Sequence, residues 1–280
     1  TKGVSAKSSL WDGTHRKFVT TFSRQFTNGY SSSQTIKEIG LYLYMIKTKV
    51  IQDDLYTICK ANINWNKLEN SSVLVTGASG LIGQYLVLVL NTLNELYNLK
   101  INVFATSRNL SKYKNIWFPI NLIESDIVNL KLPNGITHIL HTAGLASSDK
   151  YNKFPCEVIN TSFIGTKQLL DYSIRNKTSF LYFSSGEVFG ETSKTLVDET
   201  YVGVLDHTKI RSCYGESKRL IENLCLCYNH QYGIDVRIVR PDHTYGPTVD
   251  LNTDARVFAQ FVKNIVLKEN ISLKSTGEAI

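Results

Sequence analysis

Residues 76–83, TGASGLIG, decide the fold of this chain. They follow the apolar run 73–75 and open a segment of helical pattern that begins near Leu81. Gly77 can take the tight turn after a strand, Gly80 lets backbone N–H groups approach a pyrophosphate, and Gly83 allows a helix to pack closely on the strand. The N–H groups at the start of a helix carry partial positive charge and attract phosphate. A strand, this turn and a helix in that order predict a dinucleotide-binding site.

Beyond residue 71, short β-branched runs alternate with longer helical stretches. Continuous apolar strands that alternate with helices of this length are typical of a parallel sheet covered on both faces. The sequence therefore predicts an α/β, Rossmann-like, doubly wound parallel sheet. The expected strands are 71–76, 101–106, 136–142, 179–185 and 234–240, and the expected helices are 81–97, 158–175 and 213–232.

The composition is that of an ordinary globular protein. Hydrophobic residues make up 42% and charged residues 20% of the 280 positions, which excludes wholesale disorder and fibrous repeats. No apolar run reaches the roughly 18 residues that a membrane-spanning helix needs. The five cysteines have no CxxC spacing and the histidines no metal-ligand spacing, so we expect a reduced interior and no metal site. The net charge of +7 is compatible with anionic partners such as nucleotides, nucleotide sugars or nucleic acid.

The first 70 residues differ in composition from the rest. Residues 1–35 carry five basic side chains against one acid, which is typical of an organellar transit segment and also of a solvated tail. Residues 36–60 place apolar side chains at three- and four-residue steps, which predicts an amphipathic helix packed on the main domain. We expect a tail and helical extension over 1–70 and a dinucleotide-binding domain over 71–240, while the resemblance of the later motifs to a known family implies a partial substrate-binding lobe over 241–280. The expected location is the cytoplasm, or an organelle if 1–35 is a transit segment.

The residues after the second expected strand bear on the choice between NAD and NADP. An NAD site usually places Asp or Glu there to accept hydrogen bonds from the ribose 2′-hydroxyl, whereas an Arg accommodates a 2′-phosphate. Here Ser107 and Arg108 follow the strand, with no acid. The Ser107 hydroxyl could hydrogen-bond a 2′-phosphate and the Arg108 guanidinium could pair with it. A solvated loop arginine is the alternative, and the sequence favours NADP over NAD.

Tyr214 and Lys218 lie four residues apart on the expected helix 213–232, so their side chains share one face. A tyrosine near its ordinary pKa of about 10 is a poor base at neutral pH. A neighbouring ammonium favours the phenolate and lowers that pKa, so the pair can take up and return a proton. A surface tyrosine beside a solvated lysine is the alternative. Ser185 favours the first interpretation, because it ends the strand 179–185 at the carboxyl edge of the sheet, where ligands bind.

Together these residues resemble the extended short-chain dehydrogenases, in particular the NAD(P)-dependent nucleotide-sugar epimerases and dehydratases. The resemblance runs from about residue 72 to the end. The glycine turn, with its spacing GxxGxxG, is similar to the family's own, and YGESK at 214–218 matches its YxxxK. Five further segments resemble family motifs in the same order: Asp126-Ile127, HTAG at 141–144, Asn160 with Gly165-Thr166, SSGEVFG at 184–190 and RPDHTYGP at 240–247.

The resemblance implies a role for each matching residue. Tyr214 would be the base that takes the proton of a sugar 4-hydroxyl while hydride passes to the nicotinamide, giving a 4-keto sugar. Lys218 would bind the nicotinamide ribose, and Ser185 would hydrogen-bond the same sugar oxygen. The cofactor, NADP or NAD, would contact Gly77, Ser79, Gly80, Leu81, Ile82, Gly83, Ser107, Arg108, Asp126, Ile127, Thr142, Ala143, Gly144, Asn160, Lys218, Pro241 and His243.

Glu187, the fourth expected catalytic residue, bears on the fate of the 4-keto sugar. In the family's 4,6-dehydratases, and in the UDP-glucuronate decarboxylases that resemble them, a glutamate stands two positions after the catalytic Ser or Thr. This chain has Gly186 where some dehydratases carry an aspartic acid, and Arg211 ahead of Tyr214 resembles the decarboxylase branch. We expect dehydration or decarboxylation, with a 4-epimerase as the alternative. The alternative is that Glu187 is a partly exposed acid in a loop and has no role in catalysis.

Several smaller expectations complete the interpretation. A non-catalytic dinucleotide-binding or RNA-binding protein is the alternative from another class, since the chain is basic, but no basic patch interleaved with aromatics stands out. His243 replaces the family's usual Asn, and a structural role is favoured for it. Cys225 and Cys227 are expected to be packed or inert. The resemblance also implies a homodimer built from the helices 158–175 and 213–232, a part in polysaccharide biosynthesis, and a substrate lobe that continues past residue 280 in family members.

Overall fold

The computed structural model describes residues 49–113, 119–194, 196–249, 251, 254 and 256–271. All of them belong to one compact unit that starts at Leu43. The predicted transit segment 1–35 and the first part of the predicted helix 36–60 lie outside the described residues.

In the described part of the chain, six parallel strands form one sheet in the order β3-β2-β1-β4-β5-β6. This order confirms the predicted doubly wound sheet, whose strand order reverses between β1 and β4, and ligands bind outside the carboxyl ends at such a point. The strands are β1 (Ser72–Thr76), β2 (Asn102–Ser107), β3 (Ile120–Glu124), β4 (His138–His141), β5 (Ser179–Phe183) and β6 (Val236–Val239).

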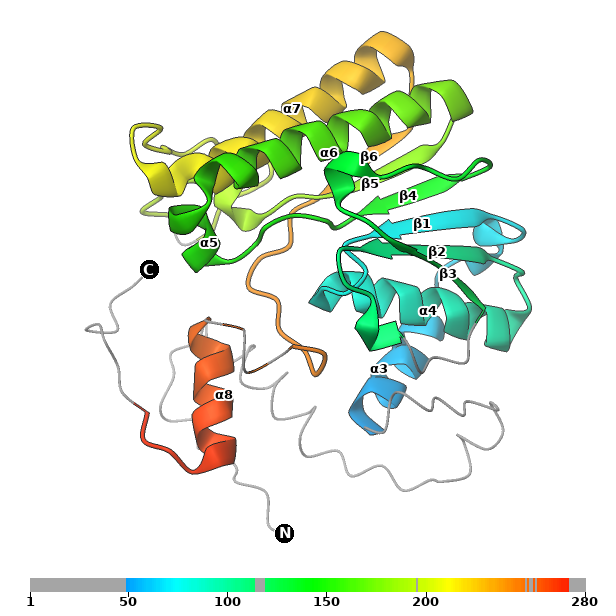
Figure 1. Cartoon of the computed structure of the whole chain (residues 1–280), viewed down its shortest axis with the longest axis horizontal. Helices are drawn as coiled ribbons and strands as arrows, with labels where there is room; N and C mark the ends of the chain where they lie inside the picture. The colour runs from blue at the N-terminus through cyan, green and yellow to red at the C-terminus, as the bar shows by residue number, and fades with distance from the viewer. Residues whose placement is uncertain are drawn as a thin grey trace. The chain divides into compact units, whose positions relative to one another are not determined.

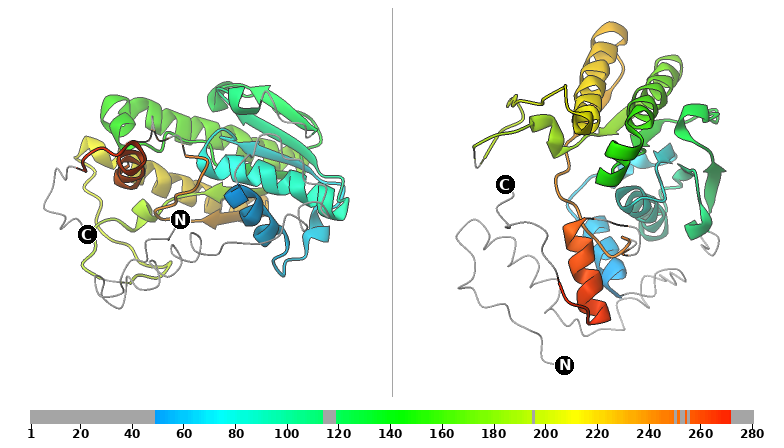
Figure 2. Two further views of the ribbon diagram at one scale, coloured as in Figure 1. Left: turned by 90° about the horizontal axis from the view of Figure 1, so that it is seen from below. Right: turned by 60° about the vertical axis from the view of Figure 1, so that its left-hand side comes forward.

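Helices cover both faces of the sheet. The long pair α6 (Pro155–Asn176) and α7 (Cys213–Tyr232) lies on one face, and α4 (Leu81–Tyr97) lies on the other with α3 (Lys49–Cys59) outside it (Figure 1). In the right-hand view of Figure 2, the α6–α7 pair again lies on the side of the sheet away from α4. Shorter helices are α5 (Ser148–Lys153) and α8 (Val257–Leu267), and 3-10 turns are η1 (Trp65–Leu68), η2 (Ser111–Tyr113), η3 (Ile127–Asn129), η4 (Gly186–Phe189) and η5 (Ile210–Ser212).

The predicted helices and strands are confirmed with small shifts. α4 and α7 have the predicted bounds, whereas α6 starts three residues earlier because Pro155 fits the first turn, where its missing N–H is not needed. β3 had no predicted bounds: it is an edge strand with Asn121 and Leu122 exposed, so its pattern is not apolar. α8 was not predicted either, since the sequence offered no bounds for helices or strands beyond residue 240.

The core lies between the sheet and the α6–α7 pair. Ile139 on β4 and Phe180 on β5 are completely buried, and Leu169 on α6 and Ile221 on α7 cover them. On the opposite face, α3 packs on α4, where Tyr85 donates a hydrogen bond of 2.8 Å to the Asp54 carboxylate. α3 is therefore the second half of the predicted amphipathic helix.

Candidate active site

A cavity of about 600 Å³ opens at the carboxyl ends of the strands. Parallel strands bring their carboxyl ends to one edge, so residues far apart in sequence meet there. The turns that follow β1 to β6 contribute, in chain order, Gly77, Ser107, Asp126, Thr142, Ser184 and Pro241 to its lining.

The glycine turn forms one wall of the cavity. Gly77 has φ +67°, and a Cβ there would lie 2.7 Å from the Ala143 nitrogen. A Cβ on Gly83 would clash with the Gly77 carbonyl oxygen. Gly80 is the N-cap of α4, and being a glycine it puts no side chain over the first N–H groups of the helix. The turn is thus a backbone cradle with partial positive charge, as a pyrophosphate requires.

Buried polar atoms beside the cradle favour a polar ligand. The hydroxyls of Thr106 and Ser184 are buried without a hydrogen-bond partner, and both residues line the cavity. Unpaired buried hydroxyls cost free energy, so such groups in a cavity wall are typical of atoms that a ligand satisfies. The residues present therefore fit a dinucleotide.

The adenosine end of the cavity lies beside β2 and β3. Ser107 Oγ and Ser79 Oγ form a hydrogen bond of 2.6 Å, which joins the end of β2 to the glycine turn. Arg108 is exposed at the cavity edge. Asp126 caps η3 by accepting a 3.0 Å bond from the Val128 nitrogen. Ser107 and Arg108 are thus within the cavity lining, as a 2′-phosphate site would need.

His141 at the end of β4 joins the glycine turn to α6. Thr166 Oγ1 donates to the Ser162 carbonyl, so it accepts from His141 Nε2 at 3.0 Å. Nδ1 then accepts from Thr76 Oγ1 at 2.7 Å, which fixes the neutral tautomer. Burial lowers the pKa of His141 to about 3, and the Lys218 charge acts in the same direction. The motif HTAG contained this residue, but only the packing shows that it holds the turn rather than a ligand.

Tyr214, Ser185 and Lys218 meet on one side of the cavity. Tyr214 is buried in the first turn of α7, with Lys218 one turn further along the same face. The Lys218 ammonium lies 5.7 Å from the Tyr214 ring centroid and donates a 2.7 Å bond to the Phe183 carbonyl. Ser185, two residues past β5, hydrogen-bonds the Tyr214 hydroxyl and is the N-cap of η4.

The ionisation of Tyr214 differs from the sequence-based expectation. Burial raises the pKa of Tyr214 above its ordinary value, while hydrogen bonds from Ser185 and Tyr151 and the charge of Arg211 lower it only in part. The expected lowering of the Tyr214 pKa is therefore not seen, because desolvation is the largest influence on it and Lys218 is not among the groups that shift it. Lys218 is itself so buried that its pKa falls to about 8.

Glu187 is held by Arg211. The guanidinium donates from Nη1 to Oε2 at 2.9 Å and from Nη2 to Oε1 at 2.8 Å. The same guanidinium lies 4.6 Å from the centroid of the Tyr151 ring, which stacks on Tyr214. Glu187 is partly exposed, as expected if it were a loop acid without a role in catalysis, but it also lines the cavity. Tyr151 was missed because nothing in the sequence distinguishes it from other helical tyrosines.

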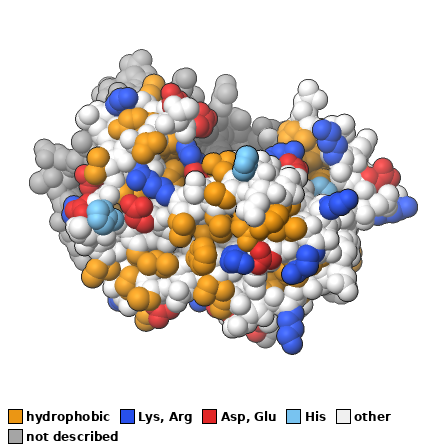
Figure 3. Space-filling model, turned by 90° about the horizontal axis from the view of Figure 1, so that it is seen from above, with side chains coloured by type: hydrophobic (Ala, Val, Ile, Leu, Met, Phe, Trp, Pro, Cys, Tyr) orange, Lys and Arg blue, Asp and Glu red, His pale blue; other side chains and the backbone are white. Residues whose placement is uncertain are grey.

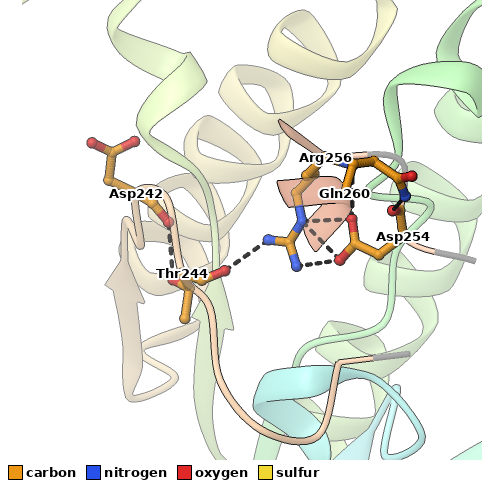
Figure 4. A network of polar contacts seen from close by, with 5 residues as sticks. All are labelled: Asp242, Thr244, Asp254, Arg256 and Gln260. Carbon is orange, nitrogen blue, oxygen red and sulfur yellow. Dashed lines mark hydrogen bonds and ion pairs between the residues drawn. The ribbon is translucent and has the colours of Figure 1, made fainter. Parts of the chain in front are cut away.

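The segment after β6 contributes to the lining of the cavity. Arg256 pairs with Asp254, with Nη2 2.6 Å from Oδ2, and donates a 2.7 Å bond to the Thr244 carbonyl (Figure 4). Arg256 and Asp254 line the cavity. This arrangement brings a charged pair from beyond residue 250 into the cavity lining, and the sequence offered no motif for it.

The profile of the NAD dependent epimerase/dehydratase family matches residues 73–280. The chain belongs to this family. Residues 1–72, which include α3, lie outside this match.

Curated relatives in the family include UDP-glucuronic acid decarboxylases. UDP-glucuronic acid decarboxylase 6 of Arabidopsis thaliana is 35% identical over 212 residues, which cover 74% of this chain and 60% of that protein. UDP-glucuronic acid decarboxylase 1 of Xenopus tropicalis is 29% identical over 210 residues, covering 75% and 49%. The chain thus spans three fifths or less of the length of these two relatives.

Solved structures show the same fold. A UDP-N-acetylglucosamine 4-epimerase from Methanobrevibacter ruminantium gives a TM-score of 0.65 at 22% identity, over 75% of this chain and 67% of that one. A UDP-glucuronic acid 4-epimerase from Bacillus cereus gives a TM-score of 0.61 at 23% identity, over 74% and 66%.

Most residues that the sequence singled out line the cavity, but Asn160 does not. Asn160 is exposed on α6, and its neighbour Thr161 lines the cavity instead. The structure therefore does not bring Asn160 into the cavity lining, and its contact with the cofactor stays a prediction. His243 lines the cavity with its side chain 97% exposed and its Nδ1 3.0 Å from Asp242, so the structural role favoured for it is wrong. Cys225 is buried as expected, whereas Cys227 is exposed.

The described residues lack both a metal cluster and a membrane-spanning helix. They hold no cluster of His, Cys, Asp and Glu with the geometry of a metal site. None of their helices combines the length and hydropathy that crossing a bilayer requires.

Proposed function

We propose that this protein oxidises the C4 hydroxyl of a nucleotide sugar with NAD(P) and decarboxylates the resulting 4-keto sugar. The observation that carries the proposal is the convergence of Ser185, Tyr214 and Lys218 on the cavity that the glycine turn opens. The curated relatives are UDP-glucuronic acid decarboxylases, so the favoured substrate is a nucleotide uronate.

The chain's own residues would move the proton. A dinucleotide held by the glycine turn would supply the acceptor, and later the donor, of the C4 hydride. Tyr214 would accept the C4 hydroxyl proton at its phenolic oxygen, and Ser185 would hydrogen-bond the same sugar oxygen. Buried Lys218 would place positive charge beside Tyr214, and its hydrogen bond to the Phe183 carbonyl would hold the ammonium in place. The 4-keto uronate is a β-keto acid, so the C5–C6 bond can break with release of carbon dioxide while its electron pair passes to the C4 carbonyl as an enolate. A proton from water at C5 then restores the 4-ketone.

Two features favour decarboxylation over dehydration. Both carboxylate oxygens of Glu187 accept hydrogen bonds from Arg211, so this pair would have to open before Glu187 could take a C5 proton. A Cβ on Gly186 would lie 3.1 Å from Asp242 Oδ1, so an acid at position 186 would bring two carboxylates together. Dehydration therefore lacks the acid that some dehydratases carry at this position.

The domain division and the cofactor preference belong to the same proposal. Residues 71–240 would bind the dinucleotide, and 241–280 would contribute to the sugar side through Arg256 and Asp254, which line the cavity. We propose NADP as the favoured cofactor within a family described as NAD dependent, because Ser107 and Arg108 lie where a 2′-phosphate would bind.

A homodimer through α6 and α7 is also part of the proposal. Ile159 and Ile164 on α6 and Leu220 and Leu226 on α7 are exposed. The face seen from above the two helices carries gathered hydrophobic side chains (Figure 3). Such a patch is typical of a protein–protein interface. Sedimentation of the full chain, and of a Leu226→Glu variant expected to be monomeric, tests it.

The decisive experiment uses the full chain with NAD or NADP and one of three substrates. UDP-glucuronate, UDP-glucose and dTDP-glucose are incubated in turn, and the products are read by mass. Loss of carbon dioxide from UDP-glucuronate is expected. Loss of water from a glucose nucleotide, or unchanged mass with inverted C4, would replace decarboxylation by dehydration or epimerisation. Salt-sensitive RNA binding without retention of any nicotinamide cofactor would favour the non-catalytic alternative.

A further inference from the structure

Arg211 lies in η5, just ahead of Tyr214, and contacts two side chains of the cavity wall. It holds both oxygens of Glu187, and its guanidinium carbon lies 4.6 Å from the Tyr151 ring centroid. Glu187 and Tyr151 line the cavity, whereas Arg211 is not among the described residues that do so. Arg211 therefore contacts the cavity wall through these two neighbours.

Tyr151 passes this contact on to Tyr214. The two rings are stacked, with centroids 4.5 Å apart and an angle of 18° between their planes. Both side chains are buried in one small apolar cluster, and their hydroxyls are hydrogen-bonded to each other. The backbone carbonyl of Tyr151 also accepts a 3.7 Å bond from Cys213 Sγ, next to Tyr214. The positions of Tyr151 and Tyr214 are therefore coupled.

We propose that Arg211 is a positioning residue for proton transfer at Tyr214, which rests on the function proposed above. Its guanidinium holds Glu187 in one orientation and keeps the Tyr151 ring against Tyr214. Stability does not explain the pair, because its side chains are 45% and 38% exposed, and ion pairs with this exposure stabilise little. A bidentate pair fixes geometry more than it adds stability.

The charges around Tyr214 determine the direction of the effect. Tyr151 faces it from α5, Tyr182 from β5, Glu187 from η4 and Arg211 from η5, with Lys218 on its own helix. Removing Arg211 removes a positive charge that lowers the pKa of Tyr214. It also leaves Glu187, whose negative charge raises that pKa, without a partner. Both changes move the ionisation of Tyr214 to higher pH.

The test is carbon-13 NMR of the full chain with labelled tyrosine rings, without substrate. A Tyr214→Phe variant assigns the Tyr214 signal. In Arg211→Gln, the signal should move at neutral pH, because the stack changes, and should titrate at higher pH than in the wild type. Arg211→Lys keeps the charge but loses the two-bond geometry. In this variant the pH at which Tyr214 titrates should return part of the way to the wild-type value. The position of the Tyr214 signal at neutral pH should return by less. Arg211→Lys also serves if Arg211→Gln does not fold.

Arg237→Gln is the matched control, since Arg237 pairs with Asp235 on the surface at 3.2 Å and lies on β6 at the edge of the sheet. It should leave the Tyr214 signal unchanged. An unchanged signal in Arg211→Gln, or an equal shift in Arg237→Gln, overturns the proposal. With a substrate that turns over, Arg211→Gln should lower kcat about tenfold or more with little change in KM. If no nucleotide sugar reacts, the proposed function fails, whereas the NMR titration still decides whether Arg211 positions Tyr214.

Discussion

Gly83 and Gly77 approach each other so closely that a Cβ on Gly83 would clash with the Gly77 carbonyl oxygen. The start of α4 is thereby pressed against the turn that follows β1, and the N–H groups of the helix face the cavity. A methyl group at position 83 would force the two apart.

Gly83→Ala should therefore destabilise the protein by about 1–3 kcal/mol and weaken dinucleotide binding, because an extra methyl group in a filled space displaces backbone. Urea unfolding and fluorescence titration with NADP measure the two effects. Gly144→Ala is the control for stability, since nothing lies within 4 Å of a Cβ there. Equal unfolding free energies of wild type and Gly83→Ala would contradict the close approach.

Arg108→Asp tests the cofactor preference. The wild-type guanidinium can pair with a 2′-phosphate, and an aspartate would repel it but accept a hydrogen bond from a 2′-hydroxyl. NADP affinity should fall roughly tenfold or more while NAD affinity falls little or rises. Calorimetry with each cofactor gives both constants, with Arg175→Asp at the far end of α6 as the control. Equal losses for both cofactors would mean that Arg108 does not contact the 2′ position.

Lys218 should make stability depend on pH in the alkaline range. Burial lowers its pKa from 10.5 to about 8, so between these values the unfolded chain binds more protons than the folded one. Stability contributed by this group therefore rises with pH across that window, by about 3 kcal/mol. Lys218→Met removes this titrating group and with it the cost of burying a charge, so the variant should be more stable than wild type at pH 8. This difference in unfolding free energy should shrink from pH 8 to pH 10. Lys167→Met, at an exposed ion pair, should differ from wild type by a constant amount. A constant difference for Lys218→Met as well would show that Lys218 stays charged.

Tyr151→Phe keeps the stacked ring and removes the hydroxyl. The hydrogen bond to Tyr151 lowers the pKa of Tyr214, so its loss should raise that pKa. If Tyr214 acts as the base, the acidic limb of the kcat/KM profile moves to higher pH and the rate at neutral pH falls. Tyr228→Phe, which loses a 2.6 Å bond to Asp171 away from the cavity, should leave the profile unchanged. A profile unaltered in Tyr151→Phe would remove the Tyr151 hydroxyl from the proton-transfer step.

The sequence by itself determined the sheet and most of the cavity wall. Glycines, alternating apolar strands and helical periods are local patterns, and strand order follows from short crossovers, so the strand ends and the turn at 76–83 were predictable. Tyr214 and Lys218 needed only the helical repeat to be placed on one face.

Only the tertiary structure decided the states and partners of these groups. The pKa of Tyr214 depends on how deeply α7 is buried, and no spacing rule contains that. Arg211 meets Glu187 across 24 residues, and Tyr151 meets Tyr214 between two helices. Asn160 shows the reverse case, since a matching motif placed it in the site, whereas the structure does not bring it into the cavity lining. Burial and contact between distant segments are properties of packing, and packing depends on the whole chain at once.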